Sequence, residues 1–131
     1  MLVAHTAAWA SIGKITALRG DAVIERDSQK LPASLGSALE GKDVISTGAN
    51  TKLQITFEDK TIITVGKESR FSIEEYLFSD NDNARARFNV LSGTIRVMSG
   101  KIGKIAPEKF TVKTKTATIG TPGIFSSSTD M

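Results

Sequence analysis

The stretch that decides the fold runs Leu53-Gln54-Ile55-Thr56-Phe57-Glu58-Asp59-Lys60-Thr61-Ile62-Ile63-Thr64-Val65. Apolar and polar residues alternate before the short polar turn at Glu58-Asp59-Lys60, and an aliphatic run resumes after it. Alternation is typical of strands with one buried face, because successive side chains of a strand point to opposite faces. The stretch therefore predicts a β-hairpin, although Lys60 stands where a left-handed turn would favour glycine.

The same alternation continues toward the C-terminus. Val90 and Leu91 end one predicted strand, Gly93 breaks it, and Ile95 and Val97 begin another. Further alternating pairs are Phe110 with Val112 and Ala117 with Ile119. Glycines recur at intervals that suit tight turns between short strands. We therefore predict an all-β fold, a single domain of short strands.

The segment 68–78 fits two patterns. Phe71, Ile73 and Leu77 alternate as in a strand, whereas Phe71 and Phe78 could share one face of a helix; we predict a strand. The polar run 79–83 is predicted to be a loop. The alternating sets give a predicted core that includes Phe57, Val65, Phe71, Ile95 and Val112.

Length and composition agree with one soluble-type domain. The chain has 131 residues, 40% of them hydrophobic and 24% charged, which suits a globular protein with its own core. No apolar run approaches the roughly 20 residues that a membrane-spanning helix needs. The chain has no cysteine, so neither disulfides nor thiolate chemistry can contribute.

Positive charge is concentrated late in the sequence. Residues 84–119 carry eight basic residues against one acidic residue, Glu108. Such a segment is either the solvated face of alternating strands or a binding patch for a polyanion. The candidate binding residues are Arg85, Arg87, Arg96, Lys101 and Lys104. Nucleic acid is not expected as a partner, because only Phe88 and Phe110 interrupt the basic series as aromatic residues.

Little in the sequence indicates catalysis. His5 is the only histidine, which leaves no histidine base for a catalytic triad and no histidine-rich metal site. The adjacent carboxylates Glu58 with Asp59, and Glu74 with Glu75, face opposite sides of a strand and are interpreted as surface charge. The run 80–83 lacks the glycine and the final glutamate of a calcium loop. We expect no enzyme activity, no metal and no cofactor.

The N-terminal residues 1–12 are predicted to be flexible. Ala8-Trp9-Ala10 has the small-x-small form that a signal peptidase recognises, and no intact export signal precedes it. Two interpretations are open: residues 1–10 are the remainder of a longer signal sequence, or they are an ordinary terminus. Of the large amphipathic aromatics, Tyr76 is expected at the edge of the core, and Trp9 belongs to the doubtful terminus.

The order of residues resembles the FecR domain, a family of extracytoplasmic β domains. The resemblance is carried by the segments 23–26, 35–36, 41–48, 53–61, 91–96, 110–114 and 116–120, together with Leu39, Ile63, Val65, Gly66, Ser69, Phe71 and Ile73. It covers residues 13–120, which leaves 121–131 as a C-terminal edge segment or tail. Gly41, Gly48, Gly66 and Gly93 would serve turns or close strand approach, and Asp43 and Thr47 would bond neighbouring amides.

The resemblance implies a β-solenoid-like or β-sandwich-like arrangement and a periplasmic or secreted location. It implies a non-enzymatic domain that binds a ligand or senses a signal, with another envelope protein or an envelope polymer as partner. The chain departs from the family at its end, where Thr121-Pro122-Gly123-Ile124-Phe125 replaces the usual closing stretch. The helical anti-sigma segment of FecR has no counterpart here, so that role is not carried over. Alternatives are a structural module that self-associates through a strand edge and a polyanion- or carbohydrate-binding module.

Overall fold

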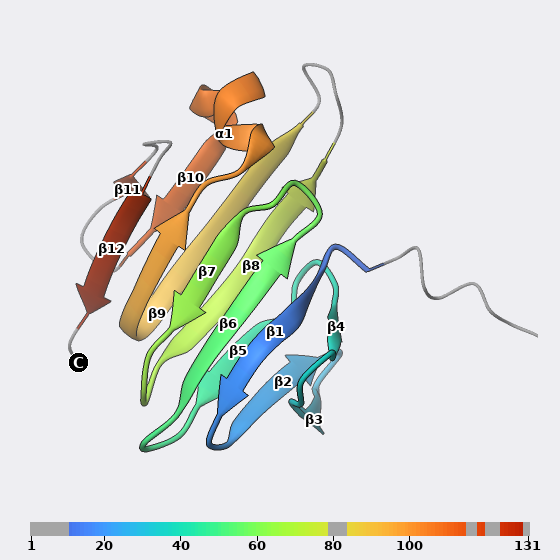
Figure 1. Cartoon of the computed structure of the whole chain (residues 1–131), viewed down its shortest axis with the longest axis vertical. Coiled ribbons are helices and arrows are strands. Elements are labelled where there is room, and N and C mark those ends of the chain that lie inside the picture. The colour runs from blue at the N-terminus through green and yellow to red at the C-terminus, as the bar shows by residue number, and fades with distance from the viewer. Residues whose placement is uncertain (1–10, 79–83, 115–117, 120–123, 130–131) are drawn as a thin grey trace, which may run out of the picture.

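The structure, a computed structural model, describes residues 11–78, 84–114, 118–119 and 124–129, the last two by their backbone (Figure 1). The strands are β1 (Gly13–Arg19), β2 (Ala22–Arg26), β3 (Gln29–Pro32), β4 (Ala38–Leu39), β5 (Val44–Thr47), β6 (Lys52–Phe57), β7 (Ile62–Val65), β8 (Arg70–Leu77), β9 (Arg85–Met98), β10 (Phe110–Lys113), β11 (Thr118–Ile119) and β12 (Ile124–Thr129). The helix α1 (Lys101–Ile105) and a 3₁₀ turn (Pro107–Lys109) follow β9. The prediction of an all-β domain is confirmed.

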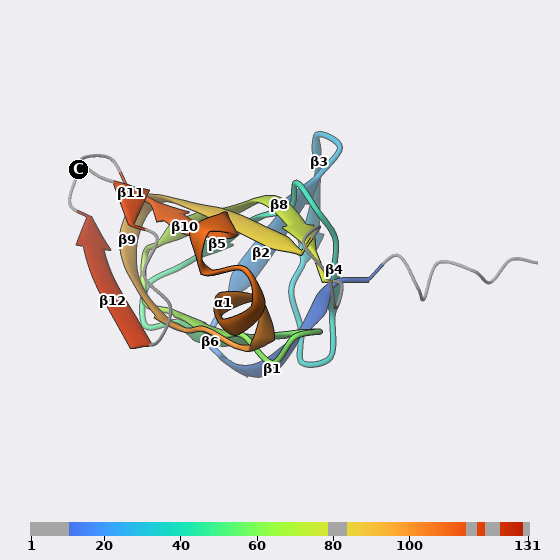
Figure 2. The same cartoon turned by 90° about the horizontal axis from the view of Figure 1, so that it is seen from above.

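The strands form one curled sheet whose two halves pack as layers (Figures 1 and 2). The front sheet has the order β4-β1-β6-β7-β9-β12, and the back sheet has the order β3-β2-β5-β8-β9-β10-β11. All pairings are antiparallel except β9 with β10, which is parallel. The arrangement is therefore sandwich-like, with β9 shared by both layers.

Strand β9 passes from one layer to the other without ending. Its first half pairs with β8 and its second half with β7. The sequence predicted two strands separated by Gly93; instead one continuous strand bends there, where Gly93 has φ 90°. A side chain is strained at this φ, and a Cβ at Gly93 would collide with the Ser69 hydroxyl. Glycine is therefore required at the bend.

Three turns cross between the layers at the same end of the molecule as the β9 bend. They are the β1–β2, β5–β6 and β7–β8 turns, which lie in a row along the lower edge in Figure 1. Backbone hydrogen bonds join each turn to the next: Gly48 N donates to Asp21 O (3.0 Å), Glu68 N to Gly48 O (3.0 Å) and Gly66 N to Thr94 O (2.8 Å). The turns therefore continue the sheet around the edge.

Three buried hydroxyl side chains, which we call the hydroxyl row, complete this edge: Thr51, Thr47 and Ser69. Thr51 Oγ1 accepts a hydrogen bond from Asp21 N at 3.0 Å. Thr47 Oγ1 accepts from Ser69 N at 2.8 Å and donates to Gly66 O at 2.6 Å. Ser69 Oγ accepts from Thr94 N at 2.9 Å. Where the chain changes direction, some backbone groups lose their hydrogen-bond partners in the neighbouring strand. Each hydroxyl of the row supplies a replacement hydrogen bond to such groups.

The core between the layers follows the alternation of the sequence. Phe57, Val65, Phe71, Ile95 and Val112 are all buried, as predicted. The rings of Phe57, Phe71 and Phe110 surround Phe88 with centroid separations of 5.3, 5.6 and 5.9 Å. Offset and tilted ring pairs at these separations stabilise a core beyond the area that they bury.

Several local predictions are also confirmed. Strands β6 and β7 form the predicted hairpin, with Ile55 opposite Ile63 and Lys60 at φ 75° in the left-handed region. The segment 70–77 is the strand β8. Of the four glycines singled out by the family resemblance, Gly93 has a positive φ, whereas Gly66 packs against Thr94. The predicted loop 79–83, the terminus 1–10, Ala117 and Pro122 lie outside the described residues.

Helix α1 closes the end of the sandwich opposite the hydroxyl row. Figure 2, which looks down on this end, shows α1 between the two layers. Its Ile102 is fully buried and belongs to the core. The segment carries few helix signals and spans only five residues. Packing therefore holds this helix, because isolated helices of such length are unstable in water.

We expect Phe57→Ala to lower the free energy of unfolding by about 3 kcal/mol or more, because the ring is buried against Tyr76 and Phe88. Urea denaturation followed by circular dichroism measures the change. An unchanged midpoint would show that Phe57 does not face the core.

Ser69→Ala should destabilise the fold by about 1–3 kcal/mol, because Thr94 N loses its acceptor at the bend. Ser46→Ala on β5 is the matched control, since the buried Ser46 hydroxyl has no hydrogen-bond partner among the residues that the structure describes. Its removal should leave the urea midpoint unchanged or raise it. Equal losses in the two variants would contradict a structural role for the hydroxyl row.

Candidate functional site

Asp59 is a buried carboxylate that fastens α1 to the β6–β7 turn. Its Oδ2 accepts hydrogen bonds from Ile102 N (2.9 Å) and Thr61 Oγ1 (2.8 Å), and its Oδ1 accepts from Tyr76 Oη (2.7 Å). The interpretation of Asp59 as surface charge is therefore wrong, although its neighbour Glu58 is exposed. The turn directs Asp59 inward, where four donors from its own chain replace water.

Tyr76 lies at the edge of the core, as predicted, and packs against Phe57. Burial raises the pKa of its hydroxyl, and the hydrogen bond to the Asp59 carboxylate raises it further. The hydroxyl therefore stays protonated and remains a donor to Asp59.

Asp43 is the second buried carboxylate, and it holds the β4–β5 turn. Arg26 donates two hydrogen bonds to it, from Nε at 2.9 Å and from Nη2 at 2.8 Å, and Glu40 N donates a third at 2.9 Å. The bond to Asp43 raises the pKa of Arg26. Paired carboxylate and guanidinium groups in this geometry position a turn. The oxygens of Asp43 and Asp59 are thus occupied by structural donors.

The five predicted binding cations lie in three different places. Arg85 and Arg87 project from the first half of β9 and bind Glu75 of β8, at 2.6 and 2.8 Å. The hydrogen bond from Arg85 lowers the pKa of Glu75. Arg96 lies on the second half of β9 in the front sheet, and Lys101 and Lys104 lie on α1. The structure therefore does not gather the five into one cluster around a single element.

A different basic surface lies on the outward side of the front sheet. We call it the basic face and define it by four exposed cations of three strands: Lys14 and Arg19 of β1, Lys52 of β6 and Arg96 of β9. None of the four takes part in an ion pair within the described residues. Strands β1, β6 and β7 and the segment 94–98 contain no aspartate or glutamate. These strand segments therefore carry positive charge without an acidic residue of their own, although Glu58 of the β6–β7 turn lines a hollow with Lys14.

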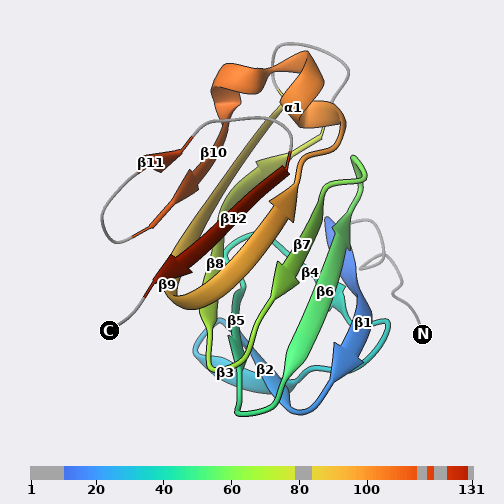
Figure 3. The same ribbon diagram turned by 60° about the vertical axis from the view of Figure 1, so that its left-hand side comes forward.

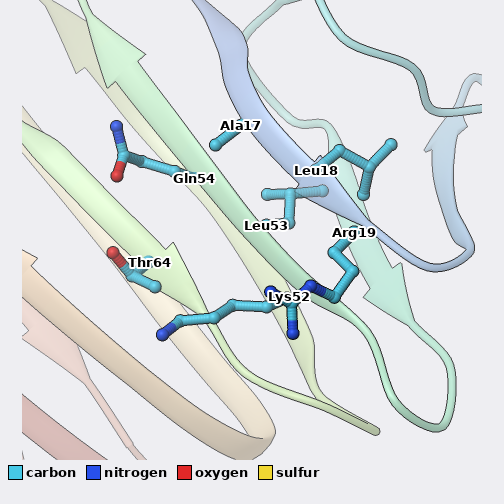
Figure 4. Close-up of a pocket in the computed structure, with 7 residues that line it drawn as sticks. All are labelled: Ala17, Leu18, Arg19, Lys52, Leu53, Gln54 and Thr64. Atoms are coloured by element: carbon cyan, nitrogen blue, oxygen red, sulfur yellow. The ribbon is translucent and has the colours of Figure 1, made fainter.

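A hollow of about 290 Å³ lies in the basic face, lined by Ala17, Leu18, Arg19, Lys52, Leu53, Gln54 and Thr64 (Figure 4). The β1–β6 ladder shifts register beside it, between Ile15 and Ala17. A second hollow toward the hydroxyl row shares Arg19 and Lys52 and adds Lys67. A third shares Gln54 and Thr64 and ends at Arg96. Shared residues make the three hollows one continuous track.

Sequence reasoning found only Arg96 of the basic face. The other cations come from segments more than 30 residues away from it. A count of charges along the sequence mixes them with acidic residues of the turns and of the back sheet. The outward positions of β6, which are Lys52, Gln54 and Thr56, carried a usable signal because none of them is acidic. Strand order is needed to place Arg19 beside them.

A comparison with models of known protein families shows to which family the chain is related. The family model described as FecR protein matches residues 43–130, more than half of the chain. The chain belongs to the FecR family. The match begins at Asp43, so β1 to β4 precede it, and it ends beyond β12. No curated protein and no solved structure matched the chain.

The FecR family is generally associated with the cell envelope. Within the described ranges, no helix has the length and apolar character of a membrane span. Nor does any group of three or more His, Asp or Glu side chains gather there in the manner of a metal site.

We expect Asp59→Asn to destabilise the protein by about 3 kcal/mol, because the carboxylate accepts four hydrogen bonds in a buried site. Amide hydrogen exchange at Gly100 and Ile102 should accelerate more than exchange in β2 or β5. Glu58→Gln, at the exposed neighbouring position, is the control and should change neither quantity. Uniform acceleration over all strands would contradict a specific role in docking α1.

Proposed function

We propose that this FecR-family chain is a non-enzymatic, extracytoplasmic domain that binds an anionic partner through the basic face. The observation that carries the proposal is the contrast between the two sheets. The outward arginines of the back sheet are paired with carboxylates, as in Arg70 with Glu25 at 3.0 Å and Glu75 with Arg85 and Arg87, whereas its lysines Lys30 and Lys113 form no ion pair among the described residues. The front sheet has cations and no acidic partner on its strands.

Uncompensated charge of one sign steers a partner of the opposite sign and strengthens its binding at low salt. The paired charges of the back sheet contribute less to the binding of an anionic partner. An arginine that already binds a carboxylate must give up that partner before it can bind a new one. The buried carboxylates Asp43 and Asp59 are engaged within the fold, which supports binding over acid-base chemistry. A periplasmic or secreted location would bring the basic face into contact with envelope proteins and polymers.

A second candidate is self-association through a strand edge. Strand β12 pairs with β9 on one side, and no other described strand pairs with it. An unpaired edge can add a strand from another molecule. Sedimentation that depends on protein concentration and is insensitive to salt would favour this candidate over anion binding.

The test compares capture of envelope material by the immobilised chain at low and high salt. The variant Arg19→Gln/Lys52→Gln should lose most of the capture that the wild type shows at low salt, because exposed charges act through a screened field. The double variant Lys30→Gln/Lys42→Gln, which removes the same charge from exposed positions off the basic face, should capture as the wild type does.

A second variant tests the cations that the sequence predicted as the binding site. It replaces five residues by neutral ones: Arg85, Arg87, Arg96, Lys101 and Lys104. This variant should lose only the part of the envelope capture that depends on Arg96. A full loss in this variant together with normal capture by Arg19→Gln/Lys52→Gln would contradict the proposal and restore the later segment as the site. Equal capture by all variants at every salt concentration would contradict both.

A further inference from the structure

Two cations of the basic face stand directly opposite each other. Arg19 of β1 pairs in register with Lys52 of β6, and both side chains line the same hollow (Figure 4). Like charges directly opposite each other destabilise a sheet. Lys67 adds a third cation to the hollow beside them, which has no acidic residue in its lining. Such a destabilising pair of like charges is expected at a position where the side chains are needed to bind a ligand.

Acidic residues do occur near this end of the track. Asp21 and Glu68 lie in the β1–β2 and β7–β8 turns, which lead away from the front sheet toward the back sheet. Neither residue lines any of the three hollows. The charge along the track itself is therefore of one sign.

The track is long enough for an extended ligand. It crosses β1, β6, β7 and β9, which are consecutive in the front sheet (Figure 3). Because neighbouring strands lie about 4.8 Å apart, this distance is about 14 Å. Cations stand at both ends, with Arg19, Lys52 and Lys67 at one end and Arg96 at the other. A linear polymer with spaced negative charges matches this layout better than a small anion does.

Hydroxyl and amide groups lie between and beside the cations. Thr16 Oγ1 lies 2.9 Å from Thr56 Oγ1 and accepts a hydrogen bond from Gln54 Nε2 at 3.1 Å. Gln54 and Thr64 also line the track. These groups can exchange their mutual hydrogen bonds for bonds to sugar hydroxyls. None of the described residues that line the three hollows is aromatic, so these residues provide no stacking surface of the kind that single-stranded nucleic acid uses.

We propose that the track on the basic face binds a linear polysaccharide that carries carboxylate groups. The guanidinium groups of Arg19 and Arg96, at opposite ends of the track, offer planar pairs of donors that fit carboxylates, and Lys52 and Lys67 add point charges beside Arg19. The threonine and glutamine groups bind hydroxyls of the sugar rings. This inference rests on the proposed function of the basic face as a binding surface and specifies its ligand.

Isothermal titration calorimetry of the full chain with polygalacturonate fragments tests the proposal, with neutral dextran, polyphosphate and oligothymidine as comparison ligands. Polygalacturonate should bind, and dextran should not. Affinity should fall about tenfold in Arg19→Gln/Lys52→Gln and less in Arg96→Gln, as expected for the loss of two exposed charge contacts or one. Lys30→Gln/Lys42→Gln should bind as the wild type does.

Equal losses in the basic-face and control variants would show a response to net charge alone and overturn the proposal. Tighter binding of polyphosphate or oligothymidine would overturn it in favour of a phosphate polymer or a nucleic acid. If polygalacturonate does not bind while envelope capture still depends on Arg19 and Lys52, the ligand class is wrong and the proposed function stands.

A second measurement checks the like-charge pair without any ligand. Arg19→Gln should leave the thermal midpoint unchanged or raise it, because it removes the repulsion from Lys52. Added salt should stabilise the wild type more than this variant, since screening has less repulsion to remove from the variant. A lower midpoint in Arg19→Gln would show that Arg19 has a structural role, which would remove the support from the like-charge pair.

Discussion

The bent edge that joins the two sheets is the constraint on which the rest of the fold depends. Chain segments that turn there leave their ladders, and Thr51, Thr47 and Ser69 satisfy the backbone groups so exposed. Each buried backbone group left without a partner would cost about 1–3 kcal/mol. Because each hydroxyl links one turn to the next, the row ties together the ends of β1, β6, β7 and β9 at this edge.

The opposite end is closed by a different device. There the layers diverge, and Asp59 draws α1 into the gap by accepting the amide of Ile102. A carboxylate suits this position because it can accept four hydrogen bonds at once, which no neutral side chain can do. The two ends thus use polar side chains in buried places, while the middle is held by the Phe57, Phe71, Phe88 and Phe110 rings.

Alternation in the sequence sufficed to predict the strands β6, β7, β8 and β10, the β6–β7 hairpin and the five buried positions named above, because side-chain direction in a strand has a period of two. It could not predict that β9 continues through Gly93, since a glycine can end a strand or bend it and only the partner strands decide. Nor could it predict that Asp59 is buried, because its donors Tyr76 and Ile102 are distant in sequence. The basic face was missed for the same reason: the register that sets Arg19 opposite Lys52 is a tertiary fact.

The location of the like-charge pair follows from the constraint at the bent edge. Lys52 directly follows Thr51, whose hydroxyl binds Asp21, and Asp21 lies two residues after Arg19. The repelling side chains therefore stand on the part of the front sheet whose backbone is held most firmly by the hydroxyl row. A rigid backbone keeps the attachment points of the two side chains directly opposite each other in the absence of a ligand, where a flexible edge would let the strands separate. Fixing the backbone below the two cations before binding reduces the ordering that an anionic ligand must impose. This is the physical advantage of a charged track beside the bent edge.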